Sequence, residues 1–296
     1  MLDLPRRALL TAALPTLLQL SGPIAAPTSL AYLPATSRTV AIGDVHGDAD
    51  ALIKVLRLAG LIDKSSAWSG GDATLVQIGD VLDRGPQEYE CLALLRSLKQ
   101  QAAASGGRVV TLLGNHEVLN ACGVTVYASE EGQEAFGESR SAAFSPGGPL
   151  AMELSTWPVA CVVGDTAFVH AGLTPALVSA GLGTTNAAAA SWLRGEAAFP
   201  PPLLLPSASQ TNSPVWTREL GVPKPTTEAC DALSAALSAL NARRLVIGHT
   251  VQPEGITCAC DERCWRVDVG LSRAMMSGTP QALEIRTGGS VRTLVG

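Results

Sequence analysis

The chain has 296 residues, of which 47% are hydrophobic and 16% are charged, and its formal net charge is −5. A chain of this length can bury a large core, and one α/β domain is the simplest organisation. The acidic balance supplies no overall basic field for the backbone of DNA or RNA. We therefore expect no nucleic-acid partner, and the composition sets no oligomeric state.

The N-terminus has the pattern of an export leader. Arg6 and Arg7 precede a mostly apolar run over residues 8–20, and small and proline-rich sequence follows. This order is typical of a secretory or twin-arginine signal, with an amphipathic or disordered leader as the alternative. Pro15 and Pro23 argue against a stable membrane span. In a plant or alga, such a leader would place the protein in the plastid (chloroplast), where the thylakoid lumen is one candidate compartment. In a bacterium it would place the protein in the periplasm.

The chain has seven cysteines, an odd number that cannot all pair within one chain. Cys91 and Cys161 lie in apolar runs, so we expect both in the core. Cys258, Cys260 and Cys264 form a cluster near the C-terminus. These three can form a disulfide, act as a redox-sensitive pair or stay inert, and the sequence leaves the alternatives open.

Apolar runs that end in glycine or a polar residue predict six strands. They span residues 39–42, 74–78, 108–113, 159–163, 167–169 and 244–247. Helical patterns at 50–58 and 87–104 separate the first three strands, which is the alternation of βαβ units. The first half of the chain therefore predicts a parallel sheet.

The second half of the chain changes to short strands and tight turns. Gly164 and Asp165 can turn a hairpin, and strand patterns recur at 265–269, 282–285 and 291–294. We expect an α/β fold of two packed mixed β-sheets flanked by helices.

Residues 120–158 and 181–227 interrupt this regularity with sequence rich in Ala, Gly, Ser and Pro. They are too long to be simple connections, and they form either the walls of a substrate cleft or tolerated surface loops. We divide the chain into a leader and linker over 1–36 and a single domain over 37–296 that contains these two insertions.

Five short signatures together contain all four histidines, several aspartates, Asn115 and Arg84. They are Gly43-Asp-Val-His-Gly-Asp48, Gly79-Asp-Val-Leu-Asp-Arg-Gly85, Gly114-Asn-His-Glu117, Val169-His-Ala-Gly172 and Ile247-Gly-His-Thr250. In the first three, an apolar strand ends in glycine and is followed by Asp44, Asp80 or Asn115. In a parallel sheet these positions share the carboxyl edge, where α/β proteins bind ligands. His170 and His249 follow later strands in the same way, so all five residues can converge.

Carboxylate, amide and imidazole donors suit manganese, iron or zinc and not a pure calcium site. A shared carboxylate can hold two ions roughly 3.5–4 Å apart, and Asp80 is our candidate for that bridge. The pattern predicts two divalent metal ions, manganese first with iron and zinc as alternatives. We expect a phosphate-ester hydrolase in which a metal-bridging hydroxide attacks phosphorus directly.

Two further groups are needed to hold a phosphate ester and to protonate its leaving oxygen. Arg84 can present a planar, bidentate fork to phosphate. His116, next to Asn115, can act as the general acid, with Asp83 accepting its other ring proton and fixing its orientation.

The first three signatures resemble those of phosphoprotein phosphatases, within the calcineurin-like metallophosphoesterases, and the resemblance runs from about Thr39 to Leu271. It implies the calcineurin-like sandwich fold, His116 as the acid and phosphate binding by Arg84, Asn115 and Arg218. It also implies a ligand set: Asp44 and His46 on the first metal, Asp80 as the bridge, and Asn115, His170 and His249 on the second.

A closer resemblance is to the Shewanella-like protein phosphatases. It rests on the segments Ala135-Phe136-Gly137 to Phe144-Ser-Pro-Gly-Gly148 and Trp192-Leu-Arg-Gly-Glu196, and on Val267-Asp-Val-Gly-Leu271 in place of a Ser-Ala-Pro-Asn-Tyr stretch. The resemblance implies a phosphoprotein substrate, with phosphoserine, phosphothreonine and phosphotyrosine all open.

Two other functions stay open at this point. A dinucleoside polyphosphate or nucleotide hydrolase can use the same metal scaffold, although Glu117 after Asn-His favours the protein phosphatases. A non-catalytic scaffold is the second alternative, and the full set of ligands, acid and arginine argues against it.

Overall fold

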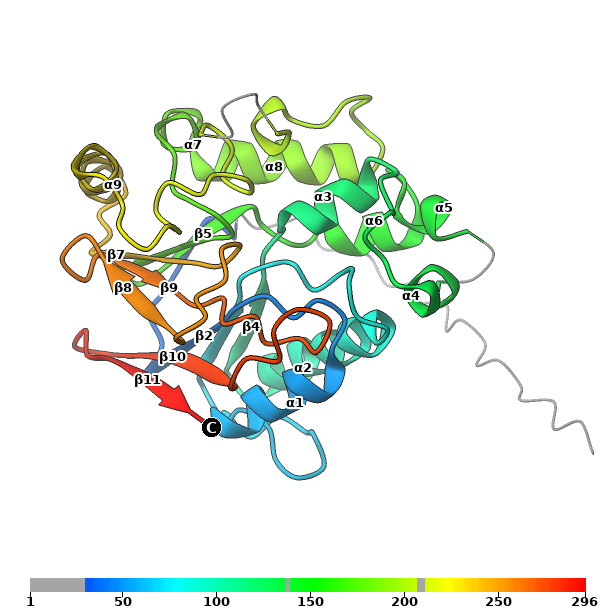
Figure 1. Cartoon of the computed structure of the whole chain (residues 1–296), viewed down its shortest axis with the longest axis horizontal. Helices are drawn as coiled ribbons and strands as arrows, with labels where there is room; N and C mark the ends of the chain where they lie inside the picture. Colours follow the sequence, from blue (N-terminus) through cyan, green and yellow to red (C-terminus); the bar gives the residue numbers. More distant parts are fainter. Residues whose placement is uncertain (1–29, 137–138, 207–210) are drawn as a thin grey trace, which may run out of the picture.

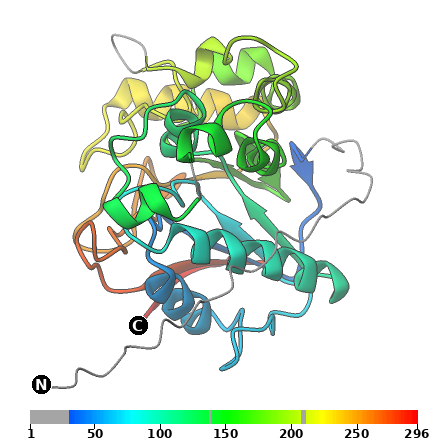
Figure 2. The same cartoon turned by 90° about the vertical axis from the view of Figure 1, so that its right-hand side faces the viewer.

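The computed structural model describes residues 30–136, 139–206 and 211–296, so the expected leader through residue 29 lies outside the described part. Two β-sheets pack face to face with helices on both outer faces (Figure 1). Figure 2 shows the layers edge on, with α1 (Ala49–Leu58) and α2 (Glu88–Ala104) below the sheets and α7 (Pro175–Ala180), α8 (Leu182–Leu193) and α9 (Thr227–Ala239) above them. The expected α/β architecture is confirmed.

The first sheet has the strand order β11-β10-β2-β3-β4. Its strands are β2 (Arg38–Ile42), β3 (Thr74–Gln77), β4 (Arg108–Thr111), β10 (Gln281–Arg286) and β11 (Val291–Val295). As expected, β2, β3 and β4 run parallel. The antiparallel hairpin of β10 and β11 extends the sheet beyond β2.

The second sheet has the strand order β1-β5-β6-β7-β9-β8. Its strands are β1 (Tyr32–Leu33), β5 (Ala160–Val163), β6 (Thr166–Val169), β7 (Arg244–Ile247), β8 (Thr257–Ala259) and β9 (Cys264–Arg266). The β5–β6 hairpin turns at Gly164 and Asp165, as expected. Of the short strands, β9 was expected at 265–269 and ends earlier, at Arg266, whereas β1 and β8, with two and three residues, were not predicted. Because β1 pairs with β5, the packed domain begins before residue 37.

The central strands are mostly apolar because both of their faces are buried. In β2, Val40 and Ile42 pack toward the outer helices, whereas Ala41 lies between the sheets. In β6, Phe168 lies between the sheets, and the neighbouring residues pack toward the helices of the other side. The continuous apolar runs in the sequence reflect these two cores.

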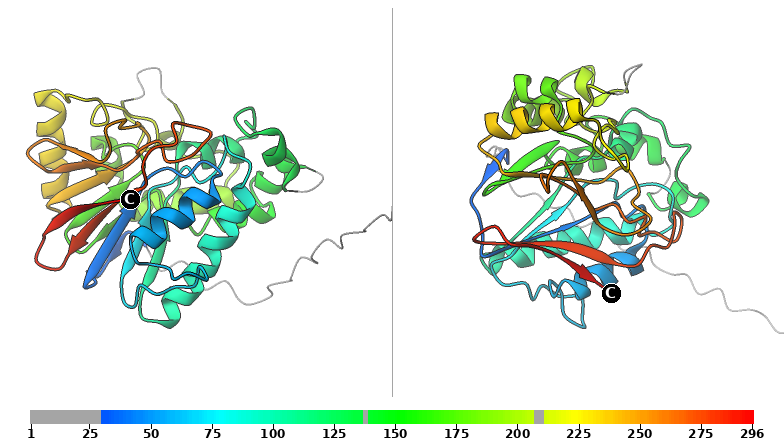
Figure 3. Two further views of the ribbon diagram at one scale, coloured as in Figure 1. Left: turned by 60° about the horizontal axis from the view of Figure 1, so that its bottom comes forward. Right: turned by 60° about the vertical axis from the view of Figure 1, so that its left-hand side comes forward.

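The outer faces of the sheets are covered by helices, of which four are the main ones. They are α1 (Ala49–Leu58) and α2 (Glu88–Ala104) on the first sheet, and α7 (Pro175–Ala180) and α9 (Thr227–Ala239) on the second (Figure 3). Asp48 caps α1 by accepting a hydrogen bond from the N–H of Ala51 at 3.0 Å. Within the described residues, no helix is both long and apolar enough to cross a bilayer.

The regular structure within both expected insertions is helical. The first contains α4 (Glu130–Glu134), α5 (Arg140–Phe144) and α6 (Pro149–Leu154), and the second contains α8 (Leu182–Leu193) and a 3₁₀ turn (Pro202–Leu204). Phe144, Leu154 and Trp192 are buried in the same core as α1 and α2. Both segments therefore contribute side chains to the domain core, and the stretches between their helices lie at the surface, with Val126 and Phe199 exposed.

Cys260 forms a disulfide with Cys230 of α9, not with a member of its own cluster. The turn between β8 and β9 carries Cys260 toward the helix, and a partner 30 residues away cannot be read from local spacing. The alternative of a disulfide within the cluster is therefore wrong. Cys258 is an exposed free thiol and Cys264 a buried one, and Cys91 and Cys161 are buried as expected.

Glu284 in β10 is a buried carboxylate that accepts hydrogen bonds from three arginines. Arg38 and Arg292 donate at 3.1 and 3.0 Å, and Arg286 donates as well. Burial of Glu284 opposes its ionisation, but these hydrogen bonds outweigh burial and lower its pKa to about 2.

Glu284→Gln should therefore lower the free energy of unfolding at pH 7 by about 1.5 kcal/mol, the low end for hydrogen bonds to a charged group, because Arg286 and Arg292 are 55% and 61% exposed. Since the folded pKa lies below the ordinary value of 4.5, this stabilisation is present above about pH 4.5 and is lost as the pH falls through about 2. Denaturant unfolding at pH 7 and pH 3 should show the difference shrinking. A difference that does not depend on pH, or an equal loss in the exposed control Glu254→Gln, would contradict this assignment.

Candidate active site

The predicted ligand residues lie close together where the carboxyl ends of the strands of the two sheets meet. Asp80 and Asn115 follow β3 and β4 in the first sheet, and His170 follows β6 in the second. The Nε2 atom of His170 lies 3.0 Å from Asn115 Oδ1 and 3.3 Å from Asp80 Oδ2. The backbone N–H of His249 donates to both carboxylate oxygens of Asp44, each at 3.2 Å, across 205 residues of sequence.

Asp80 is shared by two clusters of buried side chains that can hold a metal. One consists of His46, Asp80 and His116 and the other of Asp80, His170 and His249, and in each the candidate ligand atoms lie within 4.8 Å of one another. This is the geometry expected of a bridging carboxylate. The first cluster also shows that His116 lies close to His46, with their ring centroids 4.8 Å apart.

Three of the histidines direct a ring nitrogen to a backbone carbonyl, and in His249 it is Nε2, 3.2 Å from the carbonyl of Trp216. His46 directs Nδ1 to the carbonyl of Leu82 at 2.9 Å, and His170 directs Nδ1 to the carbonyl of Ile78 at 2.8 Å. In His46 and His170 these contacts fix the tautomer and leave Nε2 available as a ligand atom. In both residues Nε2 is the atom nearest to Asp80.

Glycines in the signatures make room for the carboxylates. A Cβ atom on Gly114 would lie 2.1 Å from Asp80 Oδ1, and one on Gly248 would lie 2.3 Å from Asp44 Oδ1. These glycines therefore let the carboxylates of Asp80 and Asp44 approach the backbone.

Several site residues have left-handed backbone conformations, which cost free energy outside glycine. They are His46 (φ 44°), Asp80 (54°), Asp83 (66°), Arg84 (74°) and His249 (64°). Glu117 holds part of this backbone in place, because its carboxylate accepts four backbone N–H bonds at 2.8–3.2 Å. Sequence reasoning used Glu117 only to separate families and missed this role.

The charge distribution of the site fits divalent cations. Burial, followed by the nearby Asp268, raises the pKa of Asp44 well above its ordinary value. Burial also lowers the pKa of His46 to about 4 and that of His249 to about 3, which keeps both imidazoles in the neutral, metal-binding form. Asp44, Asp80 and Asp268 are all buried, so a cation would offset their mutual repulsion.

Asp268 is a second residue that sequence reasoning missed. It is buried two residues beyond the end of β9, at the same carboxyl edge as the ligands that follow β6 and β7. Burial raises its pKa to about 6, and the charge of Asp80 contributes. The sequence signal that could have identified Asp268 is its place as a polar residue near the end of a short strand pattern.

The candidate acid pairs with Asp83 as expected. His116 Nδ1 lies 2.6 Å from Asp83 Oδ2, and both side chains are buried. Burial opposes protonation of His116, but Asp80 and Asp83 outweigh it and raise its pKa. The pair therefore favours the protonated imidazole that a general acid requires.

Two exposed guanidinium groups flank the buried cluster. Arg218 donates from Nη1 to the carbonyl of His249 and to Thr250 Oγ1, both at 3.0 Å. Arg84 lies over the ring of Tyr127 at 4.7 Å, and the Tyr127 and His116 ring centroids are 5.3 Å apart. Tyr127 is 41% exposed and comes from the first insertion, where no motif marked it.

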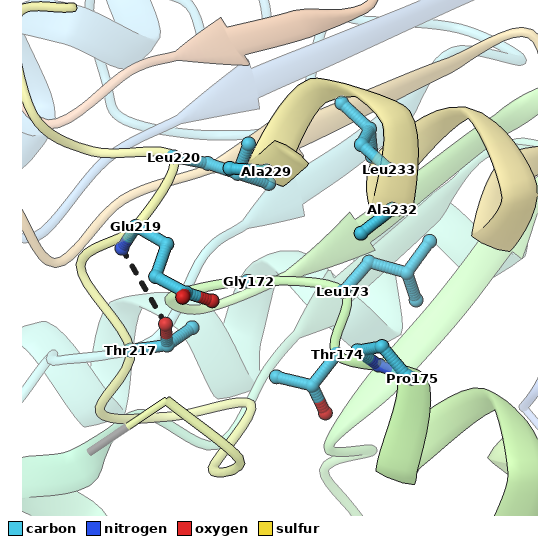
Figure 4. A pocket seen from close by; sticks show the side chains of 10 residues that line it. All are labelled: Gly172, Leu173, Thr174, Pro175, Thr217, Glu219, Leu220, Ala229, Ala232 and Leu233. Carbon is cyan, nitrogen blue, oxygen red and sulfur yellow. Dashed lines mark hydrogen bonds between the residues drawn. The ribbon is translucent and has the colours of Figure 1, made fainter. Parts of the chain in front are cut away.

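The loop that carries Arg218 packs against α9 beside the site. Figure 4 shows Leu220 of this loop facing Ala229 and Leu233 of the helix around a small pocket. The cavity measures about 30 Å³, which is room for about one or two waters and not for a substrate. This pocket therefore belongs to the packing of the loop and not to the reaction centre.

Gly114→Ala should weaken divalent-metal binding at least tenfold, because the added methyl group would displace Asp80. Metal content after dialysis against Mn²⁺, measured by plasma mass spectrometry, checks this outcome. Gly106→Ala is the control, because it strains a left-handed glycine (φ 78°) that has open space around it. It should lower stability by about 1 kcal/mol and retain the metal. Equal metal content in both variants would contradict the account.

Comparisons with known proteins agree with this geometry. Residues 37–253 match the family model of the calcineurin-like phosphoesterases. Shewanella-like protein phosphatase 2 of Arabidopsis thaliana is 34% identical over 302 residues, covering 86% of this chain and 76% of that protein. Shewanella-like protein phosphatase 1 of Plasmodium berghei is 30% identical over 254 residues, covering 82% and 69%.

The fold has solved counterparts. The cold-active protein-tyrosine phosphatase of a psychrophilic Shewanella species superposes with a TM-score of 0.71 at 23% identity, over 89% of this chain and 82% of that chain. This likeness confirms the two-sheet architecture. By family match and sequence identity, the chain belongs to the calcineurin-like phosphoesterases, hydrolases that bind two divalent metal ions, and within them to the Shewanella-like protein phosphatases.

Proposed function

We propose that this protein is a metal-dependent phosphoprotein phosphatase that hydrolyses phosphomonoesters, with His116 as the general acid. The observation that carries the proposal is the sharing of Asp80 by two buried ligand clusters, with the His116–Asp83 pair beside them. The relatives named as protein phosphatases support a phosphoprotein as the substrate.

Six residues would hold the two ions. They are Asp44 and His46 on the first, Asp80 on both, and Asn115, His170 and His249 on the second. When bound, the ions would neutralise phosphate charge and make a water acidic enough to act as a nucleophile. We propose manganese, with iron and zinc as alternatives, because the donors are oxygen and nitrogen atoms.

The side chains of the protein would divide the remaining work. The exposed guanidinium groups of Arg84 and Arg218 would bind the phosphate oxygens from two sides, and Asn115 would assist from the buried cluster. His116 would donate its proton to the leaving oxygen, while Asp83 holds the other ring nitrogen. Tyr127 would contact the side chain that carries the phosphate, because it is exposed beside both Arg84 and His116.

The manganese-loaded protein should release phosphate from p-nitrophenyl phosphate and from phosphopeptides. A panel of phosphoserine, phosphothreonine and phosphotyrosine peptides, assayed beside dinucleoside polyphosphates, identifies the substrate class. We expect the highest kcat/KM on a phosphopeptide. A higher value on a dinucleoside polyphosphate would favour the nucleotide hydrolase, and no turnover with manganese, iron or zinc would favour the scaffold.

His116→Asn should slow alkyl phosphate esters more than aryl esters. A serine alkoxide is a poor leaving group that needs a proton, whereas a phenolate, whose phenol has a pKa of about 10, needs it less. We expect kcat on a phosphoserine peptide to fall roughly 10²- to 10⁴-fold, the usual contribution of a general acid. Equal losses on both ester types would count against the role of His116.

A further inference from the structure

A buried group of charged side chains lies directly behind the general acid. Arg140 of α5 is only 2% exposed, and Asp83 and Glu88 are fully buried. Its guanidinium donates to Asp83 Oδ1 at 2.9 Å and to both carboxylate oxygens of Glu88, with the Oε1 contact at 2.8 Å. It also donates to Asn120 Oδ1 at 2.8 Å and to the carbonyl of Gly132 at 2.7 Å.

Two aromatic rings complete the enclosure of Arg140. The guanidinium carbon lies 5.2 Å from the ring centroid of Phe136 and 5.1 Å from that of Phe144. A planar guanidinium beside two aromatic rings, with its N–H groups all directed at acceptors, has one favoured orientation. Arg140 is therefore a fixed point against which other side chains can be oriented.

The two oxygens of Asp83 are used for different purposes. Oδ1 accepts from Arg140 at 2.9 Å and from Asn120 Nδ2 at 3.1 Å. Oδ2 lies 2.6 Å from His116 Nδ1. Because Oδ1 is held on one side, the carboxylate cannot rotate, and Oδ2 is directed to the imidazole.

We propose that Arg140 is a positioning residue for the reaction: by binding Asp83, it sets the orientation of the His116 ring for proton delivery to the leaving group. The inference rests on the proposed function of His116 as the acid. It also gives the first insertion a part in catalysis, because α5 lies within that segment.

Charge considerations favour this role over a purely structural one. Arg140 lies between two buried carboxylates, and only one of them contacts the acid. Anchoring the insertion to α2 needs only the Glu88 contact, since Glu88 begins that helix. The bond to Asp83 is the additional contact, and it connects the insertion to the proton donor.

The test compares Arg140→Met with a matched control, Arg244→Met. Arg244 is also buried, at 7% exposure, but it starts β7 at the end opposite His249 and contacts Asp165, Thr166 and Gly289. Both variants should lose stability. Steady-state kinetics of the manganese-loaded proteins on a phosphoserine peptide and an aryl phosphate provides the readout.

For Arg140→Met we expect kcat on the phosphoserine peptide to fall roughly 10- to 100-fold with little change in KM, and a clearly smaller loss on the aryl ester. Arg244→Met should leave the ratio of alkyl to aryl rates unchanged. An unchanged ratio in Arg140→Met would overturn the proposal and leave Arg140 a structural residue.

Two further variants keep the test decisive if Arg140→Met does not fold. Arg140→Lys keeps the charge but not the forked geometry, and it should shift the ratio in the same direction by less. In the His116→Asn background, replacing Arg140 should cause no further change in the ratio; an additional change there would refute action through His116.

If His116→Asn alone shows no ester preference, the acid assignment fails and this inference fails with it. If His116→Asn shows the preference and the Arg140 variants do not, only the inference fails.

Discussion

The sharing of one carboxylate, that of Asp80, between two groups of imidazoles is the constraint on which the site depends. Asp80 lies three residues after the end of β3 and has a left-handed backbone, with φ at 54°. Gly114 leaves space for the carboxylate, and Glu117 binds the backbone N–H groups of the turn. The position of the two carboxylate oxygens of Asp80 thus depends on the strand ends, on Gly114 and on Glu117.

The two-sheet architecture explains why such a site needs the whole domain. Asp80 and Asn115 come from the first sheet, and His170 and His249 come from the second. The first ligand cluster, with His46 and Asp80, comes from the first sheet alone, whereas the second cluster forms only where His170 and His249 of the second sheet meet Asp80. The same packing buries Asp44 beside Asp268, and burial together with the charge of Asp268 raises the pKa of Asp44. A divalent cation bound there would offset the repulsion between these carboxylates.

The sequence predicted the parts of this molecule that follow strands and missed the parts that depend on distant contacts. Asp80 and His170 were predictable because each follows an apolar run that ends at a sheet edge. Arg140 was not, since it lies in an insertion without periodicity, and its partners Asp83 and Glu88 are more than fifty residues away. The partner of Cys260 was hidden for the same reason: a disulfide between a turn and a helix leaves no local pattern.

The most direct test of the central claim is anomalous X-ray diffraction from crystals of the full chain grown with Mn²⁺. The account predicts two manganese ions per chain, with the carboxylate of Asp80 in contact with both and His46 and His170 on opposite ions. A single ion, or two ions of which Asp80 contacts one or neither, would contradict it.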